Sequence, residues 1–361
     1  MNGLICWSVL RAGQSTVMER SASMLEDLYI ALPNENIRKE VLKNWNDVLA
    51  PGEDFGILPG LTADYLMMTD GRGIRGLKPV MLLMCGDHGI CKYGVSAFPQ
   101  EVTLQMINGY GRGTAGANVM ARHAGADMVV VDIGTNFDLQ AFSHVRQCKI
   151  AWGTEDFTQG PAMSYEQAVA ALETGMRIAD EAIDGGCNLL ETGEMGIANT
   201  TSTAAIAAGF LDLPAELTVG RGSGINDERM RIKTEVVRRG LAINKPKPGD
   251  GIDVLCKVGG YDHAGLAGMM LAGAARHVPT MIDGVNATAA ALIAYGINPA
   301  CAKYLLCSHL SSDLSAKKML EVLQLKPVVH AGMRLGEGTG ASLAISILRS
   351  ALDTYRELTG E

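Results

Sequence analysis

Residues 188–210 read NLLETGEMGIANTTSTAAIAAGF, and this stretch decides the predicted fold. A short apolar run (188–194) leads into a glycine-containing loop, and a helix-like run of small residues (203–210) follows. Apolar runs without polar alternation are typical of strands buried on both faces, as in parallel sheets whose strands are connected by helices. The stretch therefore predicts one strand–loop–helix unit of an α/β protein.

The same unit recurs along the chain from about residue 79. Further apolar runs of strand length alternate with helical segments, at Pro79–Cys85, Asp127–Ile133, Val254–Val258, Pro279–Asp283, Lys303–Ser308 and Val328–Ala331. This alternation predicts a mostly parallel sheet flanked by helices, a Rossmann-like α/β fold.

The two ends of the chain have a different pattern. The first fifty or so residues are predicted to be helical, with a break at Ala50-Pro51-Gly52, and the chain is predicted to end in a helix, Ser342–Leu358. We expect the termini, residues 1–55 plus 342–361, to form a small helical subdomain beside an α/β catalytic domain of residues 56–341.

Polar residues follow the predicted strands at the points where they end. They are Asp87-His88, Asp132, Glu194, Asp283, His309 and Glu337. In open α/β sheets ligands bind beyond the carboxyl ends of the strands, so we expect these side chains to meet at one edge of the sheet.

One of these residues lies in an unusual setting. Residues 331–342, AGMRLGEGTGAS, place Glu337 among three glycines directly before the C-terminal helix. Because a helix N-terminus favours anions, we expect a low pKa and an ionised carboxylate, suited to act as a base on a bound substrate. A carboxylate that only caps the helix is the alternative. Glu194 has the same setting between glycines.

Composition excludes several classes of partner. The chain has 361 residues, is 47% hydrophobic and carries a net charge of −8, so no general basic field exists for nucleic acid or an anionic membrane. The longest apolar run, Ala264–Ala275, is too short to span a bilayer. The eight cysteines form no CxxC pair and the first residues, Met1–Leu10, lack a signal-peptide pattern, so a cytoplasmic protein is expected.

Neither a dinucleotide-binding site nor a metal site is predicted, although residues of both kinds of site are present. Gly111–Gly116 matches GxGxxG, but the helix-like segment Gln105–Tyr110 precedes it where a dinucleotide fingerprint needs a strand. The seven histidines show no close ligand spacing, so neither a metal nor another cofactor is predicted. Asp87-His88 is either an acid–base pair or, as we favour, a loop-capping aspartate beside a packed histidine.

Several segments together resemble a known family, the nicotinate-nucleotide:dimethylbenzimidazole phosphoribosyltransferases of cobamide (vitamin B12 nucleotide-loop) biosynthesis. They are MCGDHGI (84–90), GRGTAGANV (111–119), GPAMS (160–164), GEMGIANTTSTAA (193–205), VVRRGLAINKPKPGDGIDVLCKVGGYD (236–262), PTMIDG (279–284), SHLS (308–311) and MRLGEGTGASLA (333–344). The resemblance implies transfer of phosphoribose from nicotinate mononucleotide to an aromatic lower-ligand base, with release of nicotinate. It also implies a dimer.

The resemblance assigns roles to individual residues. Glu337 is expected to be the catalytic base, and Glu194 a second carboxylate that orders the site or stabilises positive charge at the ribose. The remaining substrate-binding residues are expected to be Gly196, Gly222, Gly224, Lys233, Asp262, Asp283, Gly284, Ser311, Phe98, Met106 and Leu335. Without the resemblance, Lys233 would be interpreted as a solvated helix lysine.

Departures from the family pattern concern the acceptor. Phe98 and Met106 align with a Ser and a Gln that often hold the ring nitrogens of benzimidazole, and an unpaired ring nitrogen in a closed pocket costs about 1–3 kcal/mol. The family's Gly-Ser-Leu-Gly-Arg-Leu-Glu segment is mostly absent at residues 50–58, and Trp152–Phe157 also differs. These changes resemble the branch that activates phenol or p-cresol as a heterodimer of homologous chains. An inactive partner subunit of such a heterodimer is the alternative function.

Overall fold

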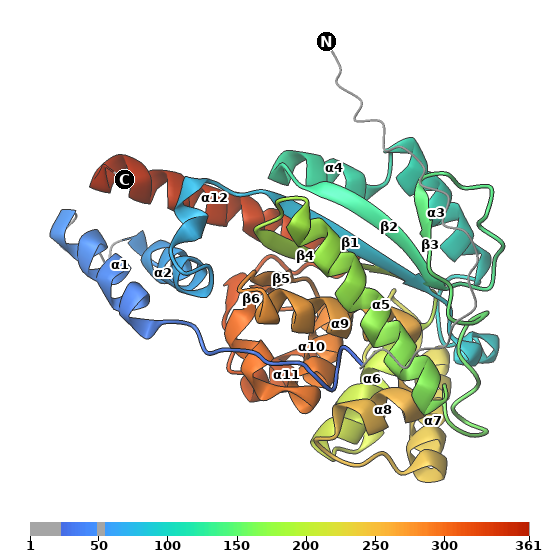
Figure 1. Ribbon diagram of the computed structural model, residues 1–361. Helices are drawn as coiled ribbons and strands as arrows, with labels where there is room; N and C mark the ends of the chain where they lie inside the picture. Colours follow the sequence, from blue (N-terminus) through green and yellow to red (C-terminus); the bar gives the residue numbers. More distant parts are fainter. Residues whose placement is uncertain (1–22, 49–54, 361) are drawn as a thin grey trace.

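A seven-stranded, all-parallel sheet forms the centre of the protein (Figure 1). The computed structural model describes residues 23–48 and 55–360. The strands lie in the order β3-β2-β1-β4-β5-β6-β7. They are β1 (Pro79–Gly86), β2 (Asp127–Gly134), β3 (Val145–Gln147), β4 (Leu189–Met195), β5 (Thr280–Ile282), β6 (Leu305–His309) and β7 (Pro327–Val329). The strand order reverses between β1 and β4, and such a switch point opens a crevice at the carboxyl ends of the strands.

Six of the seven predicted strands are confirmed, and one is wrong. Val254–Val258 belongs to α8 (Gly251–Val258), because the Asp250 side chain caps that helix by accepting the N–H of Asp253 at 3.1 Å. A short apolar run fits a strand and a buried helix equally well, so periodicity could not separate the two. The short strand β3 was not predicted.

Helices cover both faces of the sheet. They are α1 (Glu35–Val48), α2 (Leu58–Met68), α3 (Glu101–Arg112), α4 (Gly116–Ala124), α5 (Tyr165–Asp184), α6 (Asn199–Leu211), α7 (Asp227–Asn244), α9 (Tyr261–Ala275), α10 (Val285–Ile297), α11 (Ala316–Leu323) and α12 (Thr339–Thr359), besides α8. Helix α9 packs on β1 and β4 with α5 outside it, and α4 and α12 contact the sheet as well. The helix predicted at Gln105–Tyr110 is confirmed within α3, so the GxGxxG match follows no strand.

The central strand shows why its sequence does not alternate. On β1, Leu82 and Met84 belong to the larger hydrophobic core with Leu266 of α9. Met81 and Leu83 belong to a second core with Ala117 of α4. Successive side chains of a strand point to opposite faces, so a strand covered on both sides must be apolar at every position.

The helices near the two termini pack together. The Trp45 ring lies 5.4 Å from that of Phe55 and 5.8 Å from that of Tyr355, measured between centroids. Helix α1 is the part of the predicted N-terminal helical region that the structure confirms, since residues 23–34 contain no helix and the predicted break at 50–52 lies outside the described residues. Ala344 in the first half of α12 lies in the large core, so this helix joins the sheet to the terminal helices. The division into two domains stays a prediction.

Helices that could cross a membrane are absent from residues 23–48 and 55–360.

Candidate active site

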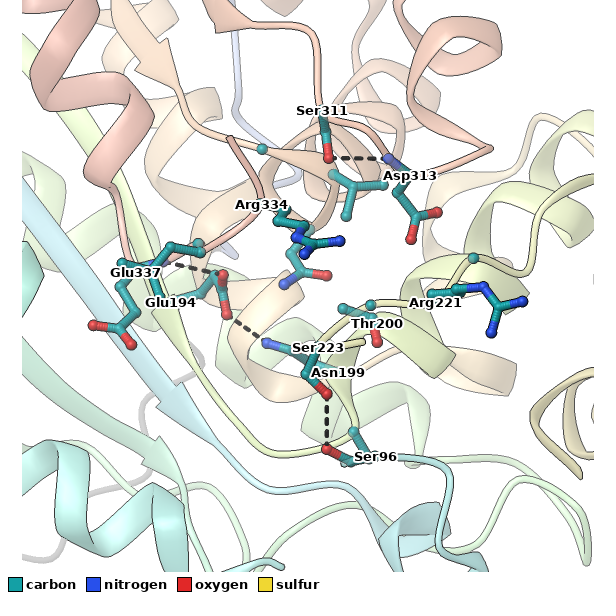
Figure 2. A pocket seen from close by; sticks show the side chains of 18 of the residues that line it. Ser96, Glu194, Asn199, Thr200, Arg221, Ser223, Ser311, Asp313, Arg334 and Glu337 are labelled. Carbon is teal, nitrogen blue, oxygen red and sulfur yellow. Dashed lines mark hydrogen bonds between the residues drawn. The ribbon is translucent and has the colours of Figure 1, made fainter. Parts of the chain in front are cut away.

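A cavity of about 710 Å³ opens beyond the carboxyl ends of the central strands (Figure 2). Nine of the predicted site residues line it: Glu337, Glu194, Gly196, Gly222, Gly284, Ser311, Phe98, Met106 and Leu335. The other four do not line it: Gly224, Lys233, Asp262 and Asp283. The sheet edge therefore brings together loops that follow β1, β4, β5 and β6, as the sequence pattern predicts.

The loop that carries Glu337 has a backbone that depends on its glycines. Gly336, Glu337 and Gly338 all have positive φ angles, of 84°, 60° and 85°. A Cβ atom at Gly340 would lie 2.2 Å from Nδ1 of His309, so this position has no room for a side chain. Only Glu337 carries a side chain through this strained turn, and the residue lies on the cavity lining.

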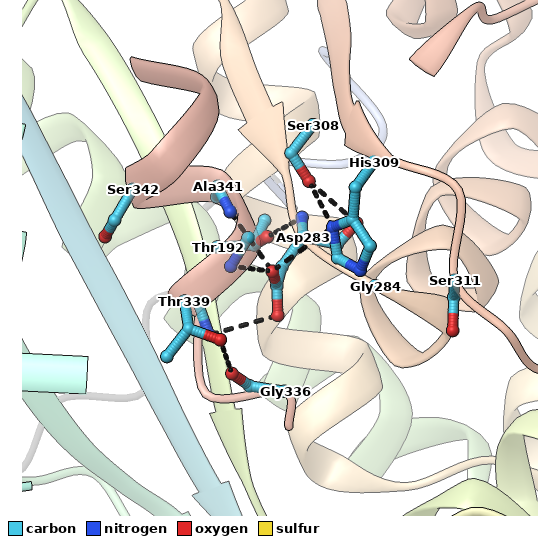
Figure 3. Close-up of polar contacts among 12 residues, drawn as sticks. Thr192, Asp283, Gly284, Ser308, His309, Ser311, Gly336, Thr339, Ala341 and Ser342 are labelled. Carbon is cyan, nitrogen blue, oxygen red and sulfur yellow. Dashed lines mark hydrogen bonds and ion pairs between the residues drawn. The ribbon is translucent and has the colours of Figure 1, made fainter. Parts of the chain in front are cut away.

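Asp283, at the end of β5, holds this loop in place (Figure 3). Its carboxylate accepts the backbone N–H groups of Gly338 at 3.1 Å, Gly340 at 2.8 Å and Ala341 at 3.1 Å. The carboxylate therefore caps the first turn of α12, and the helix N-terminus is already occupied by an anion. The capping role that the sequence leaves open for Glu337 belongs to Asp283.

The expectation of a low pKa for Glu337 is wrong. Its side chain is buried, and burial raises the pKa to about 7, with the hydroxyl of Tyr110 opposing the rise and the charge of Asp283 adding to it. Desolvation disfavours the charged carboxylate of Glu337. The N-terminus of α12, which would favour that charge, already binds the carboxylate of Asp283. A base with a pKa near 7 is better matched to proton transfer at neutral pH than an ordinary glutamate.

Glu194, at the end of β4, lies beside Glu337. Its carboxylate accepts a hydrogen bond from the Asn199 amide, and the backbone N–H of Glu337 lies 3.5 Å from its Oε1. Burial raises the pKa of Glu194 to about 8, with Asn286 opposing the rise and Asp262 adding to it. Figure 2 shows Glu194 and Glu337 on the same side of the cavity.

Lys233 is buried, so its interpretation as a solvated lysine is wrong. It is 1% exposed, and its Nζ donates to Thr200 Oγ1 at 2.9 Å and to the Gly220 carbonyl at 3.0 Å. Burial lowers the pKa of Lys233 to about 8, against the charge of Asp313. The amine lies behind the loop of Gly222 and brings a positive charge close to the cavity wall without lining it.

Asp262 is buried, within ion-pair distance of two histidines. Its Oδ2 is 3.3 Å from His88 Nε2, and its Oδ1 is 3.0 Å from His263 Nδ1. Despite burial, these two histidines hold the pKa of Asp262 well below its usual range. The three residues are the group within the described ranges whose donor atoms could hold a metal ion.

The neighbouring Asp87-His88 pair supports the capping interpretation. Asp87 accepts the Thr103 hydroxyl at 2.8 Å and the Asn136 backbone N–H at 2.9 Å, so it ties the loop after β1 to two other segments. No hydrogen bond between the side chains of Asp87 and His88 occurs in the described structure.

The cavity mouth carries apolar side chains. Phe98 is 51% exposed and Leu335 is 64% exposed, and both lie on the cavity lining with Val102 and Met106. These side chains form an apolar end near Glu337, which lies in the same loop as Leu335. The segment at Trp152 is not part of this cavity.

Four polar residues of the site were not predicted. Asn199 and Arg334 lie inside quoted motifs, so their types and positions were signals that could have been used. Asn286 lines the cavity two residues after Gly284, and the Tyr110 hydroxyl interacts with Glu337 from α3, far away in the sequence. Arg334 forms no ion pair within the described ranges, and Figure 2 shows its side chain directed into the cavity.

Fold and site together define a class of protein. A family model described as "Phosphoribosyltransferase" matches residues 30–360. The chain belongs to this phosphoribosyltransferase family.

More particular relatives agree with the family. A nicotinate-nucleotide–dimethylbenzimidazole phosphoribosyltransferase of Chloroflexus aggregans is 45% identical over 308 residues, which cover 85% of this chain and 87% of that protein. The Geobacter sulfurreducens protein of the same name is 46% identical over 281 residues, covering 78% and 80%. Among solved structures, CobT from Thermus thermophilus matches with a TM-score of 0.84 and 36% identity, over 90% of this chain and 96% of that one.

Proposed function

We propose that this chain transfers phosphoribose from nicotinate mononucleotide to an aromatic lower-ligand base, a dimethylbenzimidazole or a phenol, and releases nicotinate. The observation that carries the proposal is the pair Glu337 and Glu194 on one side of a cavity that also has glycine loops and an arginine, Arg334, directed into it. The names of the relatives supply the nucleotide and the benzimidazole as substrates.

Bond making and breaking need only one proton acceptor. The glycosidic bond between C1′ and the pyridinium nitrogen breaks, and the departing ring becomes neutral, so no general acid has to protonate it. A phenol oxygen forms the new bond to C1′ and loses its own proton to Glu337. In a benzimidazole one ring nitrogen forms the bond, and the N–H of the other ring nitrogen gives its proton to Glu337. Such a base contributes roughly 10²–10⁴-fold to the rate. Glu194 faces the ribose in this proposal. Its pKa of about 8 leaves it largely protonated at neutral pH, so we assign it the ordering of the site through its hydrogen bond with Asn199.

The nucleotide phosphate is assigned to the far side of the cavity. Gly222, Gly284 and Ser311 lie on its lining, with Lys233 behind the loop of Gly222. Phosphate binds readily to backbone N–H groups at loop and helix starts, and Gly284 directly precedes α10. Arg334 supplies a further positive charge for an anionic nucleotide.

The acceptor is assigned to the apolar end with Phe98, Met106 and Leu335. A phenol presents one polar atom to both C1′ and Glu337. A benzimidazole must hold its two ring nitrogens toward C1′ and Glu337 at once, and Phe98 and Met106 have no strong hydrogen-bonding group to orient it. We therefore propose that phenols compete with, or exceed, dimethylbenzimidazole as acceptors.

A competition assay tests the function and the acceptor together. The chain is incubated with nicotinate mononucleotide and equimolar phenol and dimethylbenzimidazole, and the ribotide products are separated by mass. Phe98→Ser with Met106→Gln should shift preference toward the benzimidazole, while Val119→Ser on α4 is the remote apolar-to-polar control. An overwhelming preference of the unaltered chain for dimethylbenzimidazole would contradict the phenolic proposal and leave the transferase proposal intact.

The partner-subunit alternative predicts no turnover by the isolated chain. Glu337 and Glu194 both lie on the cavity of this chain, as an active subunit requires. We further propose a cytoplasmic dimer, of two copies or with a homologous chain. Turnover measured with the chain alone and after adding such a homologue separates these cases.

A further inference from the structure

Three metal-ligand side chains form a buried cluster beneath the cavity floor. His88 follows β1, and Asp262 and His263 open α9, so residues far apart in sequence meet there. Each is 1% exposed, and their candidate ligand atoms all lie within 4.8 Å of one another. None of the three lines the cavity, so the cluster is separate from the groups that contact substrate in the proposed function.

The distances suit a tetrahedral ion. His88 Nε2 and His263 Nδ1 lie 3.3 Å and 3.0 Å from the two carboxylate oxygens of Asp262. Zinc binds histidine nitrogen and carboxylate oxygen at roughly 2.0–2.2 Å, so tetrahedral geometry places two such ligands about 3.3–3.6 Å apart.

One ligand atom forms no hydrogen bond. His263 Nδ1 is buried and lies 3.0 Å from its ion-pair partner, Asp262 Oδ1, without hydrogen-bond geometry. Buried polar atoms of folded proteins are nearly always hydrogen-bonded. A metal ion that takes the nitrogen lone pair would satisfy this atom.

The opposite ring nitrogens are held as they are in metal sites. His88 Nδ1 lies 2.9 Å from Ser202 Oγ, and His263 Nε2 lies 2.8 Å from Thr203 Oγ1. Hydrogen bonds to the second ring nitrogen fix the tautomer and orient the ring toward the ion in known metal centres. Both hydroxyls come from consecutive residues of α6, and that helix starts at Asn199, the partner of Glu194.

The cluster supplies one carboxylate and two imidazoles. We propose that His88, Asp262 and His263 bind one divalent transition-metal ion of the Zn²⁺ type, with water in the remaining position. The ion ties the loop after β1 to the start of α9 and supports the helix that positions Asn199. This inference does not depend on the proposed function.

Metal content and unfolding of the full-length chain test the proposal. We expect about one zinc per chain in protein purified from zinc-supplemented cells, measured by elemental analysis. Dialysis against a chelator should remove the ion and lower the unfolding temperature, and Zn²⁺ should restore it. Co²⁺ in its place should give the visible absorption of a tetrahedral site.

Variants assign the ion to the cluster. His263→Gln and Asp262→Asn should lose it, whereas His277→Gln should retain it, because His277 forms a comparable pair with Asp70 at 2.7 Å on the surface. If the ligand variants fail to fold, the Co²⁺ spectrum of the unaltered chain decides whether the protein has a tetrahedral metal site. Protein without zinc that binds neither Zn²⁺ nor Co²⁺ overturns the proposal, as does zinc retained by folded His263→Gln.

Discussion

At the scale of single residues, the chemistry centres on a carboxylate that burial has made a better base. Glu337 has a pKa raised to about 7 and a backbone φ of 60°, so both its charge and its direction are set by its surroundings. Glu337→Gln keeps the shape but cannot accept a proton, and turnover should fall about 10²-fold or more. Isothermal titration with nicotinate mononucleotide should still show binding, and near-normal turnover would remove Glu337 from the role of base.

The pH dependence of the unaltered chain follows from the same pKa. The base works only when deprotonated, so kcat/KM should be lost as the pH falls through about 7. It should also fall as the pH rises through about 8, where Lys233 loses its charge. Initial rates across this range, with enzyme stability checked at each pH, measure the profile. A midpoint near that of an exposed glutamate would contradict the assignment.

Lys233 is the second residue whose role depends on burial. Lys233→Met removes the charge but keeps most of the volume. Nicotinate mononucleotide should bind about 10-fold more weakly, because both the charge behind the Gly222 loop and the hydrogen bond that holds the Gly220 carbonyl are lost. Affinity for the aromatic acceptor should change little. Lys317→Ala is a control on an exposed lysine of α11. Unchanged nucleotide affinity in a folded Lys233→Met protein would leave Lys233 with a structural role alone.

At the scale of elements, α12 and its leading loop act as one unit fixed by Asp283. Asp283→Ala leaves three backbone N–H groups at the helix start without their acceptor. We expect a loss of at least about 2 kcal/mol in the free energy of unfolding and a loss of turnover through displacement of Glu337. Asp250→Ala, which uncaps α8, should cost about 1 kcal/mol without affecting turnover. Urea unfolding and initial rates are measured for both variants. Equal effects of Asp283→Ala and Asp250→Ala on turnover would contradict the role of Asp283 in positioning Glu337.

At the scale of the whole molecule, buried carboxyl groups make stability depend on pH. Burial raises the pKa of Glu191 to about 8, with the Ser342 hydroxyl opposing the rise. Its folded-state pKa exceeds its unfolded value, so its contribution is complete below about pH 4.5 and is lost as the pH rises through about 8. Glu191→Gln stays neutral and should therefore lose less stability than the unaltered chain between about pH 6 and 9. Urea unfolding midpoints of both proteins at about pH 6 and 9 measure this difference. Equal losses of stability in the two proteins would show that Glu191 does not titrate in this range.

Much of the architecture follows from the sequence by itself. Runs such as Pro79–Cys85 are apolar at every position, which requires cover on both faces, and strands of that kind form parallel sheets with ligand loops at their carboxyl ends. Glycines around Glu337 and Glu194 marked the loops that meet at the cavity. These features are local, because they depend on residue type and spacing within a few turns of the chain.

The tertiary structure decided what those side chains can do. Val254–Val258 became a helix because of a cap and its packing, and Lys233 became a buried cation because the loop of Gly220 covers it. The pKa of Glu337 rose because neighbours distant in sequence exclude water, and Asp283 had already taken the helix terminus that would have lowered it. Burial and partners are set by residues brought together from across the chain, so spacing along the sequence does not contain them.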